Sequence, residues 1–326
     1  MLAATSATAR QQLRHNGTRA LHVVHDLAAL RSLRADARKA GQTVAFVPTM
    51  GALHSGHLGL IDHARKHADL VVTSIFVNPA QFAPHEDLDR YPRTLPDDVR
   101  ALTEHGVAHA VFAPSVATMY PRGISTHVDQ QRGAFVAVEG LSHQLEGGVR
   151  PHFFRGVATV VTKLMNAVEP DVVVFGQKDA QQCCVVRAML DDLLVNTRMI
   201  VAPTARDPID HLALSSRNRY LTPEQRSVAP ALAHGLLAAQ DLFGRGTTDR
   251  AQLVQAVLDT IRASDPSGEK MVVEYVKLTS RNLEEVGSVK VGGDPESDRD
   301  VGAILSAAVR VGNTRLIDNV VLGCWL

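Results

Sequence analysis

Short, continuously apolar runs alternate with segments of helical spacing through the first two thirds of the chain. Runs that are apolar on both faces are typical of parallel strands covered by helices on both sides. We therefore predict an α/β fold with a doubly wound parallel sheet, a Rossmann-like nucleotide-binding domain. The predicted strands are 43–47 (stopped by Pro48), 70–77, 110–112 and 171–175, and the predicted helices are 57–68, 97–104, 157–168 and 180–190.

The pattern changes after about Val201. Two helices rich in Ala and Leu, 223–243 and 251–263, precede candidate strands at 272–278, 303–309 and 314–322. Two helices with an antiparallel set of strands predict a smaller C-terminal α+β domain. The expected division is a flexible tail at 1–20, a Rossmann-like domain at 21–204 and an α+β lid domain at 205–326.

The composition of the chain argues against several classes of binding partner. Lys plus Arg total 34, as do Asp plus Glu, so the formal charge is zero, and aromatic residues make up only 4%. Such a balance gives no electrostatic reason to expect nucleic acid or an anionic membrane as partner. No stretch reaches the roughly 20 apolar residues that span a bilayer. The three cysteines lack zinc spacing, so no protein-bound metal is predicted.

The first 20 residues carry Arg10, Arg14 and Arg19, and no acidic residue precedes Asp26. This composition resembles a weak mitochondrial presequence, and it also fits a flexible tail, which we favour. A cytoplasmic location is therefore expected, with a mitochondrial one as the alternative.

Candidate chemistry is concentrated in residues 48–57, which follow the first long strand. Ligands bind at this carboxyl edge in doubly wound sheets, and the next helix turns its positive amino end toward an anion. His54 and His57 are three residues apart and share one helical face, and Gly56 leaves space for a flat ring. The plainer interpretations of two such histidines are a surface pair and a partial metal site. The absence of a third ligand nearby argues against a metal site. Because a strand, a turn and a glycine are all in place, we favour phosphate chemistry over a surface pair.

Two further segments carry groups that suit phosphate. Lys178 and Asp179 follow strand 171–175, where a lysine can neutralise a β- or γ-phosphate and the carboxylate can orient it. As a plain surface ion pair they would contribute only about 0–1 kcal/mol. Residues 215–218 offer two hydroxyls and the guanidinium of Arg217, which can grip phosphate oxygens, although the same letters would pass for an ordinary turn.

Neutral amides follow the second long strand at Asn78 and Gln81. Amides can hold hydroxyls and a carboxylate without competing as nucleophiles, so both are expected to face the same crevice. Gln182, on a predicted helix, would by itself be read as a solvated surface residue.

These segments together resemble a known family. His54-Ser55-Gly56-His57 is similar to the His-x-Gly-His signature of the nucleotidyltransferase superfamily, which includes class I aminoacyl-tRNA synthetases. The ordered set resembles the pantothenate synthetases in particular, over about residues 21–319. The matching segments are 47–57, 76–82, 86–93, 145–148, 154–157, 175–179 and 214–218.

The resemblance implies ATP-dependent condensation of (R)-pantoate with β-alanine, which gives pantothenate, AMP and pyrophosphate through a pantoyl adenylate. It implies a homodimer, magnesium as the companion of ATP, and His57 as proton donor. The implied catalytic residues are His54, His57, Lys178 and Arg217. The implied ATP contacts are Met50, Gly51, Ala52, Leu53, His54, Ser55, Gly56, His57, Gly176, Gln177, Lys178, Asp179, Ala205, Leu214, Ser215, Ser216 and Arg217, and the implied pantoate and β-alanine contacts are Gln81, Gln182 and Asn78.

The chain departs from the family pattern at three positions near these motifs. Gln177 stands where the family usually has Glu, Ala180 where an aromatic is common, and His211 where it has glycine. None of these changes removes a group that the chemistry requires. Two other functions stay open: a nucleotidyltransferase that joins AMP to a different acceptor, and a non-catalytic nucleotide sensor. A sensor would not need all four catalytic groups.

Overall fold

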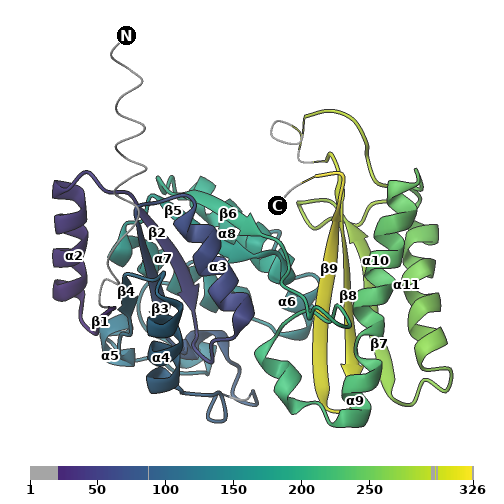
Figure 1. The fold of residues 1–326 in the computed structure, drawn as a ribbon, viewed down its shortest axis with the longest axis horizontal. Coiled ribbons are helices and arrows are strands. Elements are labelled where there is room, and N and C mark those ends of the chain that lie inside the picture. The colour runs from purple at the N-terminus through teal and green to yellow at the C-terminus, as the bar shows by residue number, and fades with distance from the viewer. Residues whose placement is uncertain (1–20, 87, 295–297, 299, 325–326) are drawn as a thin grey trace.

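The computed structural model describes residues 21–86, 88–294, 298 and 300–324. Two sheets organise the chain: a six-stranded sheet in the first 202 residues and a three-stranded sheet near the C-terminus (Figure 1). The predicted tail at 1–20 lies outside the described residues.

The large sheet is parallel throughout and has the order β1-β4-β3-β2-β5-β6. The chain passes from β2 outward to β3 on one side and returns to β5 on the other, so β2 and β5 flank the point where the winding reverses. Such a reversal opens a crevice at the carboxyl ends of the strands, where ligands bind. The strands are β1 (His22–Val24), β2 (Val44–Thr49), β3 (Leu70–Ile75), β4 (Ala110–Phe112), β5 (Val172–Gly176) and β6 (Arg198–Ala202).

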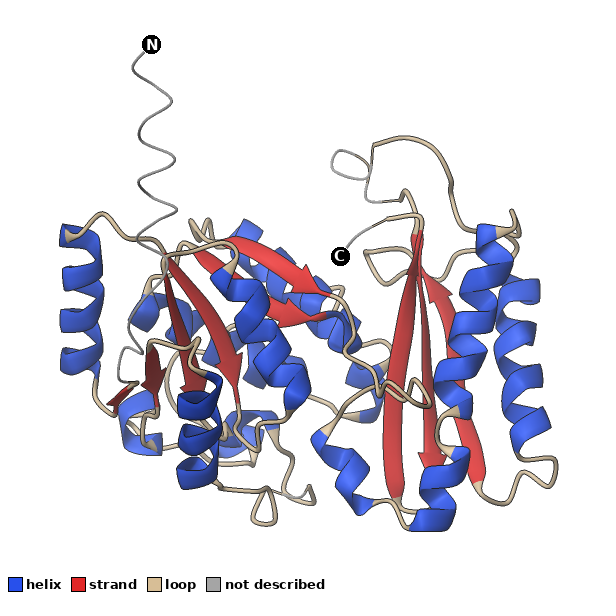
Figure 2. Ribbon diagram, viewed as in Figure 1, coloured by secondary structure: helices blue, strands red, loops and turns tan. Residues whose placement is uncertain are grey.

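Helices cover both faces of this sheet, as Figure 2 shows. Buried residues of α3 and α4 pack on one face, and those of α2, α7 and α8 pack on the other. The continuous apolar strands are buried on both sides for this reason, as predicted. The helices are α2 (Leu27–Lys39), α3 (Ser55–Arg65), α4 (Leu95–His105), α5 (Val116–Met119), α6 (Glu146–Val149), α7 (Phe153–Val168) and α8 (Ala180–Asp192), with short 3-10 turns η1 (Pro79–Gln81), η2 (Val128–Gln130) and η3 (Gln177–Asp179).

The small sheet is antiparallel, with the order β7-β8-β9. Helices α10 and α11 lie on the side of this sheet that faces away from the large sheet (Figure 1). The fold class is therefore confirmed: a doubly wound parallel sheet with a smaller α+β part. The elements are η4 (Ser216–Tyr220), α9 (Pro223–Val228), α10 (Ala231–Gly244), α11 (Arg250–Ser264), β7 (Met271–Thr279), β8 (Ala303–Val311) and β9 (Thr314–Leu322). The domain boundary at 204/205 stays a prediction.

Several element boundaries were predicted wrongly. Strand β2 does not stop at Pro48 but runs through it to Thr49. Its pairing with β5 has already ended at Phe46, so the missing amide hydrogen of Pro48 breaks no bond of the β2–β5 ladder. The helix predicted at 223–243 is two helices, because α9 ends at Val228 and α10 starts after Pro230. Strands β1 and β6 and helix α2 were not predicted.

Candidate active site

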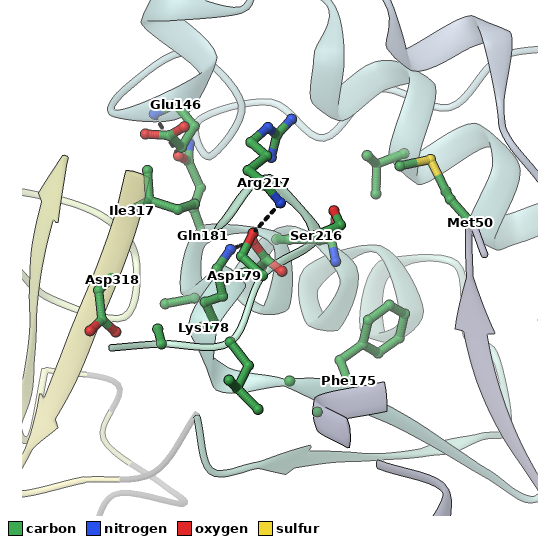
Figure 3. A pocket seen from close by; sticks show the side chains of 18 of the residues that line it. Met50, Glu146, Phe175, Lys178, Asp179, Gln181, Ser216, Arg217, Ile317 and Asp318 are labelled. Atoms are coloured by element: carbon green, nitrogen blue, oxygen red, sulfur yellow. Dashed lines mark hydrogen bonds and ion pairs between the residues drawn. The ribbon is translucent and has the colours of Figure 1, made fainter. Parts of the chain in front are cut away.

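A cavity of about 890 Å³ lies at the carboxyl edge of the large sheet, and the small sheet closes its other side. His54, His57, Lys178 and Arg217 all line it, although they come from three distant segments of the chain. Figure 3 shows the cavity from close by, with Asp318 of β9 opposite the residues of the large sheet. The sequence-predicted groups are therefore brought together around one space.

The two histidines sit at the amino end of α3, where they cap the helix. His54 is the N-cap residue, and its Nδ1 accepts a hydrogen bond from the Gly56 amide at 3.1 Å. His57 Nδ1 accepts one from the His54 amide at 3.3 Å, which completes a capping box. The ring centroids lie 4.1 Å apart. A Cβ at Gly56 would lie 2.9 Å from His54 Cε1, so the flat ring that needs this glycine is the one of His54 itself.

Both imidazoles are held in a neutral, donating form. Because Nδ1 accepts a backbone hydrogen bond in each ring, the ring proton lies on Nε2. Burial and the neighbouring His54 lower the pKa of His57 to about 3. Burial and the nearby Lys178 also lower the pKa of His54. At neutral pH these residues can donate N–H hydrogen bonds to an anion, whereas a proton-donating imidazolium at His57 is disfavoured.

The loop before the histidines is held by a buried carboxylate that sequence reasoning missed. Asp98 of α4 is only 3% exposed. Its Oδ1 accepts from the Leu53 amide at 2.8 Å and its Oδ2 from the Ala52 amide at 3.1 Å. Gly51 and Ala52 both have positive φ, and a Cβ at Gly51 would lie 2.9 Å from Asp98 Oδ2. Glycine at 51 is therefore a requirement of this clamp. The acidic first turn of α4 was the available signal.

The cationic side of the cavity comes from η3 and η4. Lys178 Nζ lies 3.3 Å from Asp179 Oδ1, and the lysine side chain is only 17% exposed. The Ser215 hydroxyl accepts a hydrogen bond from the Arg217 amide and so caps the turn. Among the described residues, no carboxylate pairs with the Arg217 guanidinium. Lys178 and Arg217 can therefore both meet the phosphates of a nucleotide.

Asn78 and Gln81 occupy the end of the cavity beyond β3. Asn78 Oδ1 accepts from the Tyr120 hydroxyl at 2.6 Å, and its Nδ2 donates to Gln81 Oε1 at 3.0 Å and to the Gly156 carbonyl at 3.1 Å. The Asn78 amide, 1% exposed, has no group left for a substrate. Since Oε1 of Gln81 is occupied, its Nε2 is left to face a ligand. Asn78 thus orients Gln81 through this hydrogen bond, and the predicted contact of Asn78 with a substrate stays a prediction.

Some residues that were predicted to contact ATP do not line the cavity. The amides of Ala52 and Leu53 are taken by Asp98, and the Gln177 side chain donates to Asn319 Oδ1 at 3.4 Å. The predicted residues that line it are Met50, His54, Gly56, His57, Asn78, Gln81, Gly176, Lys178, Asp179, Gln182, Ala205, Leu214, Ser215, Ser216 and Arg217; those that do not are Gly51, Ala52, Leu53, Ser55 and Gln177.

Sequence reasoning also missed a polar cluster on the far wall of the cavity. Arg315 of β9 donates to Glu146 Oε1 at 2.8 Å and to Glu274 Oε2 at 2.6 Å. The Tyr275 hydroxyl donates to the same Glu146 oxygen at 2.7 Å. Glu146 belongs to one of the segments that carry the family resemblance, but its sequence context alone gives it no role. This cluster joins α6 to the small sheet.

Metal clusters and membrane spans are both absent from the part of the chain that the structure describes. No group of three or more His, Cys, Asp or Glu side chains there is placed to hold a metal ion. None of the helices described is both long enough and apolar enough to cross a membrane.

Comparison with known proteins gives the same family over nearly the whole chain. The family model for pantoate-beta-alanine ligase matches residues 22–321. The pantoate–beta-alanine ligase of Saccharomyces cerevisiae is 43% identical over 313 residues, which cover 92% of this chain and 99% of the yeast protein. The pantothenate synthetase of Pelotomaculum thermopropionicum is 45% identical over 302 residues, covering 92% and 99%.

Two solved structures that are similar to this chain come from the same family. Pantothenate synthetase from Thermus thermophilus superposes with a TM-score of 0.78 at 39% identity, covering 92% of this chain and 98% of that one. The Francisella tularensis pantoate-beta-alanine ligase, solved in complex with beta-gamma ATP and beta-alanine, gives a TM-score of 0.69 at 30% identity, covering 93% and 98%. Together with the ordered motifs, these matches lead to one conclusion: the chain belongs to the pantoate-beta-alanine ligase family.

Proposed function

We propose that the cavity carries out the reaction of the family, the ATP-dependent condensation of (R)-pantoate with β-alanine. The observation that carries the proposal is the convergence of His54, His57, Lys178 and Arg217 on one cavity at the switch point of the sheet. The match of the family over nearly the full chain favours this function over a different AMP acceptor or a non-catalytic sensor.

The first step is adenylation. A pantoate carboxylate oxygen attacks the α-phosphorus of ATP, the bond from that phosphorus to the bridging oxygen breaks, and pyrophosphate leaves. The attack brings two anions together, so neutralising groups around the triphosphate lower the barrier. Lys178 and Arg217 supply positive charge, and the neutral Nε2–H groups of His54 and His57 donate to the oxygen whose charge grows.

The second step transfers the acyl group. The amine of β-alanine attacks the carbonyl carbon of the mixed anhydride, the carbon–oxygen bond to AMP breaks, and the amine loses a proton to give the amide of pantothenate. The free Nε2 of Gln81, oriented through Asn78, is suited to bind the carboxylate or hydroxyl of pantoate. An adenylate held inside the cavity is protected from water.

Magnesium fits this site as a companion of the nucleotide. Mg²⁺ in nucleotide sites is held by phosphates together with one or two carboxylates, and Asp179 is a carboxylate at the cavity wall beside Lys178. When bound, the ion would neutralise phosphate charge. The homodimer and the cytoplasmic location stay predictions.

A reconstitution assay tests the function. The purified protein is mixed with ATP, magnesium, pantoate and β-alanine, each is omitted in turn, and AMP and pantothenate are measured. We expect both products only with the complete set, and pyrophosphate without β-alanine. Pyrophosphate release that ignores pantoate but responds to another acceptor, which takes up the AMP, would assign the site to a different nucleotidyltransferase. ATP binding without turnover would make it a sensor.

A further inference from the structure

Two polar residues of β9 are buried in a position where a strand usually carries apolar side chains. Asp318 and Asn319 are each 2% exposed. Asp318 is on the same face of the strand as Leu316, Val320 and Leu322, which pack in the core of the small sheet, and Asn319 is on the opposite face. A buried carboxylate and a buried amide are costly unless they are fully hydrogen-bonded. Apart from the Asn319 amide, which donates to Asp318 Oδ1 within β9, the partners of these two side chains lie in the segments that lead to Lys178 and Arg217.

Asn319 holds the segment that carries Lys178. Its Nδ2 donates to the carbonyl of Gln177 and to the carbonyl of Lys178, both at 2.9 Å. Its Oδ1 accepts from Gln177 Nε2 at 3.4 Å. These contacts fix the main chain of η3 rather than the lysine side chain, which stays available to a phosphate.

Asp318 holds the segment that leads to Arg217. Its two oxygens accept hydrogen bonds from Arg206 Nη1 at 2.6 Å and from Arg206 Nη2 at 3.1 Å. This is a bidentate pair between a guanidinium and a carboxylate, which fixes the orientation of both groups. The same guanidinium donates to the His211 carbonyl at 3.2 Å. Arg206 also pairs with Ala213, two residues before Ser215, where the Arg217 turn begins.

We propose that Asp318 and Asn319 are positioning residues for ATP, which set the separation between the Lys178 and Arg217 segments from one rigid strand. Figure 3 shows Asp318 on β9 across from Lys178 and Arg217, which belong to different segments. Asp318 and Asn319 are neighbours on β9 and hold the Lys178 and Arg217 segments, so a shift of this strand moves both cations together. The proposal rests on the proposed function only in assigning those cations to the triphosphate.

The test measures the affinity of the protein for a non-hydrolysable ATP analogue by calorimetry, together with KM for β-alanine. Asn319→Asp keeps the shape but removes the donor to both carbonyls. We expect the Kd of the analogue to rise about tenfold or more, while KM for β-alanine changes less than about twofold. Asp318→Asn should also raise the Kd. Asn282→Asp, the same chemical change in the turn after β7 and away from the cavity, should change neither quantity.

Double-mutant cycles separate positioning from general damage. If Asn319 acts through Lys178, the effect of Asn319→Asp should largely disappear in a Lys178→Ala background. The effect of Asp318→Asn should likewise disappear in an Arg217→Ala background. Urea unfolding checks that each variant is folded, and Asn319→Ser, whose hydroxyl cannot reach both carbonyls, replaces Asn319→Asp if the latter does not fold.

The outcomes distinguish the two levels of inference. A normal affinity in folded Asn319 and Asp318 variants, or effects that persist unchanged in the Lys178→Ala and Arg217→Ala backgrounds, would overturn the positioning role. Lys178→Ala and Arg217→Ala variants that bind the analogue normally would instead overturn the assignment of these cations in the proposed function.

Discussion

The histidine turn and the two cationic segments are held in place by different means. His54 and His57 take their positions from hydrogen bonds within four residues, between each ring and the amides of the turn itself. Asn319 holds the main chain of the segment that carries Lys178, and Asp318 holds the side chain of Arg206 in the segment that leads to Arg217. Both β9 residues lie more than 100 residues further along the chain than the cation that each supports.

This difference separates two tasks of the site, the chemical step and the binding of the nucleotide. A locally capped turn keeps the geometry and tautomer of its imidazoles whatever the small sheet does. The cations depend on the small sheet, so the part of the site that we propose to bind the triphosphate responds to how the two sheets sit together. Substitutions in the turn should therefore affect chemistry, and substitutions on β9 should affect nucleotide affinity.

The largest effect is expected at the turn. His57→Ala removes a neutral donor from the transferring phosphoryl group and should lower the rate of pantoate-dependent pyrophosphate release by about 10²–10³-fold. His57→Gln places an amide N–H at a similar reach and should restore part of that loss. Pyrophosphate release in single turnovers measures both.

Binding of the ATP analogue is the control for this comparison, because a turn that is independent of the cations predicts little change in affinity for either variant. Near-normal adenylation by His57→Ala would remove His57 from the mechanism. Equal losses for the Ala and Gln variants would argue against a neutral donor.

Asp98 tests how local the turn really is. Asp98→Ala leaves the buried amides of Ala52 and Leu53 without an acceptor, which should lower the free energy of unfolding by about 2–4 kcal/mol. Asp98→Asn keeps the shape and an acceptor oxygen and should lose less. Urea denaturation gives the stability, and the KM for ATP reports whether the turn has moved. If stability is unchanged, the clamp is not needed and the turn is fully self-contained.

The same contrast explains what could be predicted from the sequence. The turn at 54–57 was placed correctly at the amino end of a helix, although that helix starts at Ser55 and not at His57. This placement could be predicted because its determinants, a strand end, a glycine and two histidines at helical spacing, are neighbours in the chain. The strand β9 was predicted with its observed bounds, but the roles of Asp318 and Asn319 were not, since no local pattern says which distant segment a buried polar residue meets. Asp98 stands in the acidic first turn of α4, but that local signal does not say which distant loop the carboxylate meets.

Missed elements have a physical explanation as well. Strand β1 has three residues and lies at the edge of the sheet, so its apolar pattern is short, and β6 carries the exposed Arg198 at its start. The neutral state of His57 could not be predicted either, because its pKa depends on burial in the folded cavity. The motif identified the residue, and only the fold identified its protonation state.

That protonation state makes stability depend on pH. Since folding lowers the pKa of His57 from its ordinary 6.5 to about 3, the unfolded chain takes up a proton below pH 6.5 that the folded chain refuses. This contribution to stability is complete above pH 6.5 and is lost as the pH falls toward 3. Between pH 8 and pH 5 it amounts to about 2 kcal/mol. Urea unfolding at both values should show a smaller acid loss for His57→Gln than for the unchanged protein; equal losses would place an ordinary pKa at His57.

The smallest effect is expected in the segment that Asp318 braces. His211, which stands where the resemblance expects glycine, has φ +63° and presents its carbonyl to Arg206. Glycine adopts this conformation without strain, whereas a residue with a Cβ does not. His211→Gly should therefore be about 1 kcal/mol more stable than His211→Ala, a matched pair that lacks the imidazole in both members. Both should keep the ATP-analogue affinity within about twofold, because the main-chain carbonyl remains. Equal stability of the two variants would mean that the segment relaxes out of this conformation, and the brace would then be looser than its hydrogen bonds indicate.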